Sequence, residues 1–523
     1  MDTMTNQNQP GTEPTPEGAP QQPPRPFPNQ DFIRPGIDDR PDWDTALSDE
    51  DMEAVQRLAV RQKPQVAPDA AAQPEVQAAA LENTPAVHDD PLPDAESAFL
   101  DLRDPMVDAS GYRPTHVEVV RMKTGFALTS FFLSFALCAL NLVLVPERLD
   151  QMVGGFDGTT DLAWLIAIGV AVTILSTAVM LPVSDRTRTK YGRRAPWFLG
   201  GAVVAVLLTS ALAASRTDVT LTVAWAFLQL GFAAMQFALF ASIGERVPDK
   251  FRDAVALWRK VGWGAGLLAG VVVAALCMDA AAGGIEICAG AVALAAVCML
   301  LVVPREHSSS YLRITPMATS DMTTILRVPG APRAWLVATL ARLLASAAVT
   351  VPLAFVWFIV KYVHGFDAPL DLRMTMLAVV AMAVVAYVCM AIATVVLRPV
   401  MAKWEDDVRA PAIAACVISV LAVACPLLMP SATGLMLFAA LFAFSTTMLQ
   451  DLAQSLATSV IERTSERGAY LAVLNTADSG GKLIGALAGG VTVLCAGATQ
   501  PLFIVSGVLA ILTIVCVAFV RQR

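Results

Sequence analysis

Runs of about 20 mainly apolar residues recur along the chain from Thr124 to Val520, and short polar segments separate them. A helix needs about 20 such residues to cross roughly 30 Å of hydrocarbon. The pattern therefore predicts an all-α membrane protein with twelve transmembrane helices. The first six lie at about 124–145, 161–182, 195–215, 220–244, 262–281 and 285–304, and the other six at about 334–361, 373–398, 411–429, 433–460, 469–495 and 500–520.

The composition agrees with this pattern. Hydrophobic residues make up 55% of the chain and its mean hydropathy is +0.57, whereas soluble domains are about 45–50% apolar even when Gly is counted. The nine cysteines fall inside the predicted spans without a CxxC pair, and the four histidines fall outside the hydrocarbon depth. We therefore expect no disulfide, no bound metal, no other cofactor and no intramembrane metalloenzyme.

The N-terminal segment differs from the rest of the chain in charge and composition. Residues 1–118 contain 23 acidic and 8 basic residues and are rich in Pro, Gln and Ala. Such a segment buries too little apolar surface to offset the entropy of ordering, so we predict a disordered cytosolic tail over residues 1–116. Residues 48–63 combine an N-terminal capping pair with helical apolar spacing, which predicts either a transient helix or one that docks on another protein.

Lysine and arginine gather in the loops on one side of the predicted bundle. These loops lie near 184–197, 246–252, 305–327, 398–409 and 463–467, whereas the opposite loops carry few cations, such as Arg148 and Lys361, beside acids such as Glu147 and Asp150. Basic loops stay in the cytosol. The distribution predicts a multi-pass protein of the cell membrane with both termini cytosolic, and no signal peptide is expected because the first 120 residues lack an apolar stretch preceded by positive charge.

The two halves of the predicted bundle resemble each other. The pattern Glu245-Arg246, Gly262, Gly266 and Gly270 is matched about 215 residues later by Glu462-Arg463, Gly481 and Gly485. Glycines spaced by four residues let helices approach closely in lipid. We therefore predict a six-helix bundle over 117–304, a cytosolic linker over 305–333 and a second six-helix bundle over 334–523.

The loop between the second and third spans reads SDRTRTKYGRRAPW from Ser184 to Trp197. Together with twelve spans in two similar halves, it resembles the major facilitator superfamily of secondary transporters, whose loop at this point carries a Gly-x-x-x-Asp-Arg-x-Gly-Arg-Arg pattern. Here Leu181 or Pro182 replaces the opening Gly. The ending Gly-Arg-Arg-x-Pro-aromatic is similar to the glycoside-pentoside-hexuronide cation symporters and the sucrose-type carriers.

The charges of this loop predict a gating latch on the cytosolic side. Asp185 can receive helix N-terminal amides or an arginine from the other half, and the arginines can pair with Glu245 or Glu462 when the cytosolic mouth is shut. Alternatively, the arginines only set topology and bind anionic lipid. The gating candidates are Asp185, Arg186, Gly192, Arg193, Arg194, Glu245, Arg246, Glu462 and Arg463.

Ionisable residues inside a span are costly and are functional candidates. Four lie in the second half: Arg342, Asp451, Asp478 and Lys482. Asp478 and Lys482 are four residues apart on one helical face, which favours an ion pair and leaves Asp451 to pair with Arg342. These pairs either fasten helices together or provide a site for a coupled cation. A proton is favoured over sodium, because the stretch from Leu162 to Val183 contains no acid, whereas the second helix of sodium-coupled sugar carriers of the resembled family bears acids for the cation.

Neutral polar residues in the spans are candidates for lining a solute path. They are Asn141, Gln229, Gln236, Gln450, Gln454 and Asn475. Four tryptophans, Trp164, Trp225, Trp263 and Trp357, either line the same path or belong to the interfacial belt.

Three functions are compatible with this sequence. The first is a secondary active transporter of a sugar or other small polar solute, working as a monomer by alternating access and proton-coupled. The second is an exporter of amphiphilic compounds, and the third is a non-transporting sensor or scaffold that acts through the acidic tail. A nucleotide-driven pump is not expected, since no GxxxxGK[ST] loop occurs. We also expect neither an enzyme nor a nucleic-acid-binding protein.

Overall fold

A computed structural model describes residues 106, 108, 112–153, 158–306, 309, 332–362, 371–404, 407–458 and 467–520. The chain divides into two units, Met1–Ala67 and Pro68–Arg523, and every described residue belongs to the second. The predicted tail up to residue 105, its helix at 48–63 and most of the linker at 305–333 lie outside the described residues, as do Glu462 and Arg463.

The described chain is helical. The first half contains α5 (His116–Ala139), η3 (Leu140–Leu144), α6 (Val145–Val153), α7 (Gly158–Arg186), α8 (Ala195–Ala214), α9 (Asp218–Arg246), α10 (Asp249–Leu276), η5 (Met278–Ala280) and α11 (Ala281–Leu301). The second half contains α13 (Arg333–Ala354), α14 (Val356–Lys361), α15 (Leu372–Lys403), α16 (Arg409–Leu428), α17 (Ala432–Thr458), α18 (Arg467–Ala496) and α19 (Gln500–Phe519).

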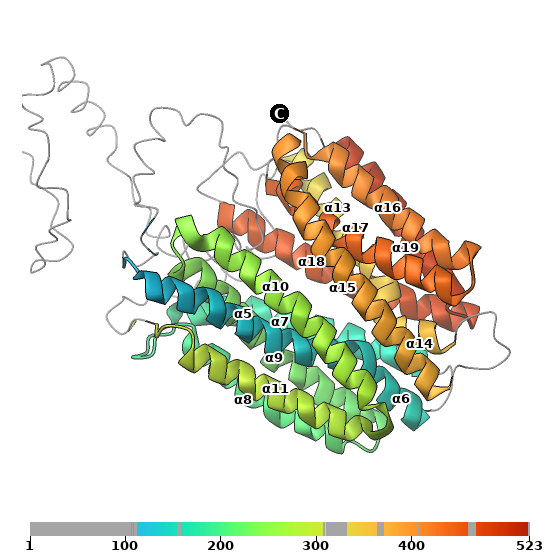
Figure 1. Cartoon of the computed structure of the whole chain (residues 1–523), viewed down its shortest axis with the longest axis horizontal. Coiled ribbons are helices and arrows are strands. Elements are labelled where there is room, and N and C mark those ends of the chain that lie inside the picture. The colour runs from blue at the N-terminus through green and yellow to red at the C-terminus, as the bar shows by residue number, and fades with distance from the viewer. Residues whose placement is uncertain are drawn as a thin grey trace, which may run out of the picture. The chain divides into compact units, whose positions relative to one another are not determined.

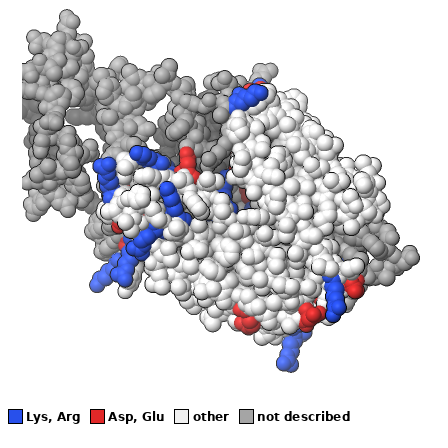
Figure 2. All heavy atoms as spheres, viewed as in Figure 1, with Lys and Arg blue, Asp and Glu red and all other residues white. Residues whose placement is uncertain are grey.

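The prediction of twelve spans is confirmed, because the described residues form twelve helical segments long and apolar enough to cross a membrane. In each half the helices alternate in direction. We call the end at which α5 and α13 begin the basic end, and the other the opposite end. Figure 2 shows charged side chains near both ends and an uncharged surface between them, as a lipid-facing belt requires.

The glycine repeats explain how each half is packed. In the first half α10 lies beside α5 (Figure 1), and a side-chain carbon at Gly262, Gly266 or Gly270 would overlap a backbone carbonyl of α5. In the second half α18 lies against α13 in the same way, with Gly481 and Gly485 on its carbonyls. Both predicted glycine faces are confirmed, and they place the fifth helix of each half against its first.

The first span of each half is interrupted near the opposite end. In the first half a π-helical turn, η3, separates α5 from α6 directly before Pro146. Proline cannot donate a backbone hydrogen bond, and its ring displaces the preceding turn, so a wider turn accommodates it. In the second half α13 contains Pro352 and stops at Ala354, and α14 continues beyond Phe355. These breaks give the short helices α6 and α14, which approach each other at the opposite end (Figure 1).

The main difference from the predicted helix boundaries concerns α10. It begins at Asp249, whereas the sequence pattern placed the fifth span at 262–281. The charged first turns, which contain Lys250, Arg252, Arg259 and Lys260, hid the start of the helix from a hydrophobicity criterion. The additional turns include Lys260, which takes part in the candidate site described below.

Candidate functional site

A charged cluster in the second half centres on the carboxylate of Asp478 in α18. Arg342 of α13 places its Nε 3.2 Å from Oδ1, and Lys482 places its Nζ 2.9 Å from Oδ2. The hydroxyl of Ser346 also donates a hydrogen bond to Oδ1. The predicted pair between Asp478 and Lys482 is confirmed, and α13 adds a second cation to it.

The predicted pair between Arg342 and Asp451 is wrong. Arg342 is directed at Asp478, and its Nη1 donates to the backbone carbonyl of Gln450 instead of to a carboxylate of α17. Asp451 follows Gln450 in α17. The prediction that Arg342 contacts α17 was therefore correct, but the predicted partner on that helix was wrong. Guanidinium groups often satisfy a carboxylate and a carbonyl at once, because their donors fan out in a plane.

Asp451 instead joins the two halves of the molecule. Lys260 of α10 donates to both carboxylate oxygens of Asp451, at 3.0 Å each. Their side chains are 36% and 14% exposed, respectively. Lys260 was not among the predicted site residues, because the hydrophobic pattern placed it just outside the fifth span. Nothing in the sequence pointed to Lys260, because Arg342 and Lys482 already balance the two intramembrane acids of the second half.

A second ion cluster joins the halves at the opposite end. Lys361 of α14 pairs with Asp150 of α6 and lies 3.6 Å from the carboxylate of Glu147. Tyr362 donates its phenolic hydroxyl to Asp150 at 3.1 Å. Burial raises the pKa of Tyr362 to about 12, and the negative charge of Asp150 adds to the rise, so the phenol stays a donor. In the sequence these residues were recognised only as loop charges.

The basic loop between α7 and α8 is tied into the first half. The fully buried guanidinium of Arg194 pairs with Glu245 at the end of α9 and donates to Ser184 at 2.7 Å, while Arg193 lies 3.5 Å from Glu245. The predicted pairing with Glu245 is confirmed for Arg193 and Arg194. Because all of these residues belong to the first half, this pairing positions the loop within one bundle and is not itself a link between bundles.

Glu306, which follows α11, caps the start of α8. Its carboxylate accepts hydrogen bonds from the backbone amides of Arg193, Arg194 and Ala195 at 2.8 to 3.2 Å. Anions are favoured at a helix N-terminus, where free amides and the helix dipole coincide. Gly192 has a φ of 92°, and a side-chain carbon there would overlap this carboxylate. The carboxylate of Glu306 thus requires a glycine at position 192 and binds the backbone amides of the two arginines that follow it. The sequence analysis did not identify Glu306 as a site residue.

The remaining predicted site residues are placed as follows. Arg246 donates to the backbone carbonyl of Pro304, which attaches the end of α9 to the end of α11. Arg186 ends α7. The backbone of Asp185 and of Gln454 is helical, but their side chains lie outside the described residues.

The neutral candidates are spread over several helices. Asn141 lies on the π-helical turn η3, where its side-chain amide donates to the carbonyl of Leu137 at 2.7 Å. Gln229 lies beside Gly169 of α7 and next to Trp225. Gln236 and Asn475 are half-buried, whereas Gln450 is exposed. Trp225 and Trp357 are buried, and Trp263 is half-buried against the core, so among the four the interfacial-belt interpretation best suits Trp164, which is 60% exposed.

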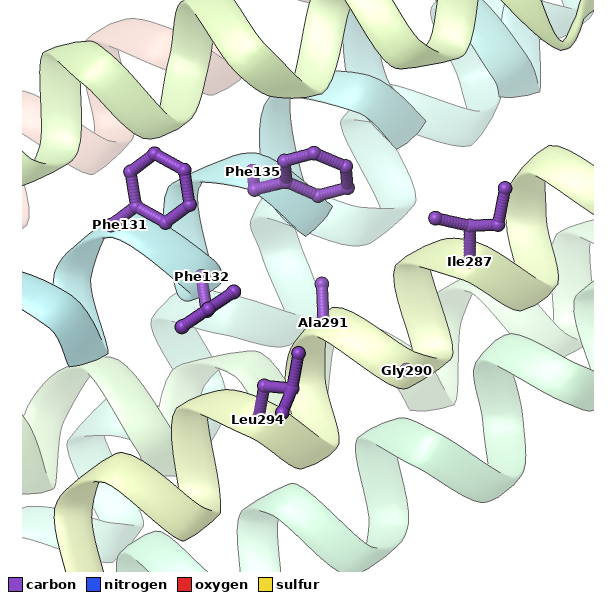
Figure 3. Close-up of a pocket in the computed structure, with 7 residues that line it drawn as sticks. All are labelled: Phe131, Phe132, Phe135, Ile287, Gly290, Ala291 and Leu294. Atoms are coloured by element: carbon purple, nitrogen blue, oxygen red, sulfur yellow. The ribbon is translucent and has the colours of Figure 1, made fainter.

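One hollow in the described surface lies away from these residues. It has a volume of about 440 Å³ and is lined by α5 and α11 with Phe131, Phe132, Phe135, Ile287, Gly290, Ala291 and Leu294. Figure 3 shows Phe132 of α5 and Leu294 of α11 directed toward each other in the space between the two helices. The lining offers almost no hydrogen-bonding groups and includes exposed residues of the belt. Its chemistry suits lipid chains and not a polar solute.

Comparison with known proteins assigns this arrangement to a fold. The family model of the Major Facilitator Superfamily matches residues 380–523, which lie in the second half. No curated protein sequence matches the chain. The twelve spans in two related six-helix bundles give the chain the major facilitator fold.

Solved structures extend this likeness over both halves. The chain is similar to a mutant form of the nucleoside transporter NupG, with a TM-score of 0.60, 11% identity and coverage of 76% of this chain and 99% of that one. A second structure of NupG gives a TM-score of 0.57 and 12% identity, with coverage of 76% and 97%. A bacterial homologue of the human lysosomal transporter Spinster, inward-facing and unoccupied, gives a TM-score of 0.51 and 12% identity, with coverage of 78% and 95%.

Proposed function

We propose that this protein is a secondary active transporter of the major facilitator superfamily that moves a small polar solute by alternating access. The observation that carries the proposal is the pair of ionic links between the two halves. Lys260 and Asp451 connect α10 to α17, and Lys361 and Asp150 connect α14 to α6. Transport by rocking two bundles requires contacts that form at one end while those at the other end break.

The proposed coupling ion is a proton. Asp451 and Asp478 are carboxylates within spans, and each is held by at least one cation. Protonation removes the negative charge and weakens the pair, so proton binding favours separation of the groups that the pair joined. For Asp451 these groups belong to different halves, which gives a route from proton binding to bundle movement.

The proposed solute is a sugar or a similarly hydroxylated molecule. Amide side chains supply both donors and acceptors, and the candidates on this path are Asn141, Gln229, Gln236, Gln450, Gln454 and Asn475. In this proposal the basic loop keeps α7, α8 and α9 together as one rigid body while the halves move, because Arg194 pairs with Glu245 of α9 and donates to Ser184 of α7.

The proposed orientation places both termini and the basic end in the cytosol of the cell in which the protein resides, with the bundle in the cell membrane. Labelling of a cysteine introduced at Lys190, an exposed residue of the basic loop, tests this point. An impermeant thiol reagent should react with it only after permeabilisation, and reaction in intact cells contradicts the orientation.

Reconstitution into proteoliposomes tests transport and coupling together. A panel of labelled sugars and nucleosides is offered under an imposed pH or sodium gradient. We expect accumulation with the pH gradient, and we expect Asp451→Asn and Asp478→Asn to abolish accumulation while allowing exchange. Asp371→Asn is the matched control, because Asp371 is an exposed N-cap of α15 and asparagine keeps the cap. Full accumulation by both Asp451→Asn and Asp478→Asn would contradict proton coupling at these acids and would show that they only fasten helices together.

A further inference from the structure

The charges in the ion pairs of Asp451 and Asp478 do not balance. Among the described residues that pair here, three are cations, Lys260, Arg342 and Lys482, and two are anions, Asp451 and Asp478. The pair of Lys260 with Asp451 is neutral. The group around Asp478 therefore carries one excess positive charge inside the membrane-spanning part of the chain.

Lys482 is the cation that carries this excess. Asp478 already receives Arg342 and the hydroxyl of Ser346 on Oδ1, and the side chain of Arg342 is only 9% exposed. The side chain of Lys482, in contrast, is 49% exposed. An ammonium group has three donors, and the structure gives Lys482 one acceptor, Oδ2 of Asp478.

The exposed side chain of Lys482 lies deep within a membrane span. The residue lies in the span Val473–Ala496, about 13 Å from its first residue and about 21 Å from its last at 1.5 Å per residue. A charged side chain at such depth faces the interior of the bundle or a water-filled space, because hydrocarbon does not solvate it. Lys482 thus offers an ammonium group to a polar molecule that enters the bundle.

We propose that the transported solute is a small organic anion and that its carboxylate or phosphate group binds Lys482. This inference rests on the proposed transport function and names the charge of its solute. The anion supplies the negative charge that the cluster lacks, and the hydrogen bond to a charged donor is stronger than one to a neutral amide.

Binding of an anion also changes the surroundings of Asp478. When the ammonium group of Lys482 turns to the solute, Oδ2 of Asp478 loses its partner, while Arg342 and Ser346 remain on Oδ1. The carboxylate then retains one of the two cations that hold it ionised, so it takes up a proton more readily. The anion and the proton enter together, and the combined movement carries no net charge when the solute has a single negative charge.

The test uses solutes in matched pairs that differ in one anionic group. The pairs are D-gluconate with D-glucitol, D-glucuronate with D-glucose, and glucose 6-phosphate with D-glucose, each offered to proteoliposomes that contain the full chain. Uptake is measured for the native protein and for the variants Lys482→Gln, Lys482→Arg and Lys403→Gln. Lys403 is an exposed residue at the end of α15, so its variant controls for the loss of one positive charge.

We expect the anionic member of at least one pair to be transported in preference to its neutral partner. Lys482→Gln should lower uptake of that anion about tenfold at low concentration, whereas Lys482→Arg and Lys403→Gln should keep most of it. The carboxylate and phosphate members identify which anion the site accepts.

Two outcomes overturn the inference. One is transport of neutral members at rates equal to or above those of the anions, and the other is equal anion uptake by native protein and Lys482→Gln. In both, transport itself persists and the proposed function stands. Absence of uptake for every member of the three pairs and for the sugar and nucleoside panel contradicts the transport proposal instead. Gel filtration of Lys482→Gln in detergent separates a loss of folding from a loss of binding.

Discussion

Replacing Lys361 with methionine is predicted to open the opposite end of the molecule. Lys361 lies between two acids of the other half, Asp150 and Glu147, whose side chains are 11% and 5% exposed. Methionine keeps the length and the apolar stem of lysine but removes the charge. The two carboxylates of α6 are then left in a buried site without the ammonium group that compensates them.

The expected energy follows from this burial. Removing one partner of a buried ion pair costs about 3 to 5 kcal/mol, because an uncompensated charge remains. When α6 separates from α14, water solvates both carboxylates and most of this unfavourable energy disappears. The variant therefore favours the open conformer over the closed one. A shift of about 3 kcal/mol changes the ratio of closed to open conformers more than a hundredfold, which converts a minor open conformer into a major one.

Electron-spin distance measurement is the assay. Spin labels are placed on Val153 of α6 and Met374 of α15, which are 39% and 56% exposed near the opposite end, in a background where the native cysteines are replaced. We expect the distance distribution in lipid nanodiscs to gain a longer component in Lys361→Met. Lys361→Arg should resemble the native protein, because arginine keeps the positive charge.

The combined variant gives the decisive comparison. In Lys361→Met with Asp150→Asn and Glu147→Gln, no charge of this cluster remains buried, so the longer component should shrink toward the native distribution. A distance distribution that is the same in Lys361→Met and in the native protein would refute the argument that this ion cluster holds the halves together.

Three further predictions concern packing and the basic loop. Gly266→Ala should lower the melting temperature of the detergent-purified protein by several degrees, since its new carbon overlaps the carbonyl of α5, whereas Gly200→Ala should leave it unchanged because no atom lies within 4 Å of that position. Glu245→Gln should cost about 3 kcal/mol and lower the yield of folded protein, because Arg194 is fully buried. Its control is Glu286→Gln, since Glu286 is exposed. Glu306→Gln should speed tryptic cleavage in the α7–α8 loop, because a neutral amide caps the amides of α8 less strongly, and an unchanged cleavage rate contradicts this account of the cap.

The sequence predicted those features that depend on local composition and spacing. Spans follow from apolar length, and the contact of α10 with α5 follows from Gly262, Gly266 and Gly270, because close helix approach in lipid depends on small residues at that spacing. The pair of Asp478 with Lys482 was predictable for the same reason, since both residues share one helical face.

Pairings between distant segments could not be read from spacing. Arg342 had two acids within reach by depth, and only the rotation of α13 about its axis selects Asp478 over Asp451. Lys260 was excluded by a boundary criterion that treats charge as evidence against a span. Glu306 became visible only when the end of α11 was placed beside the start of α8.

The repeat and the function use different residues of the same helices. Gly262 and Gly481 make equivalent contacts with the first helix of their halves. When the two halves are aligned on these glycines, Arg259 corresponds to Asp478, and Trp263 corresponds to Lys482. The packing residues agree while the charges differ in sign or are absent, and Arg259 lies over the ring of Phe240 at 5.0 Å. A duplicated bundle needs only the glycine face to be retained for folding. The charged cluster of the second half and the link through Lys260 therefore lie where the two halves differ in sequence. In the proposed mechanism, this asymmetry places the binding and coupling groups in the second half, and Lys260 of the first half is the partner that responds to them.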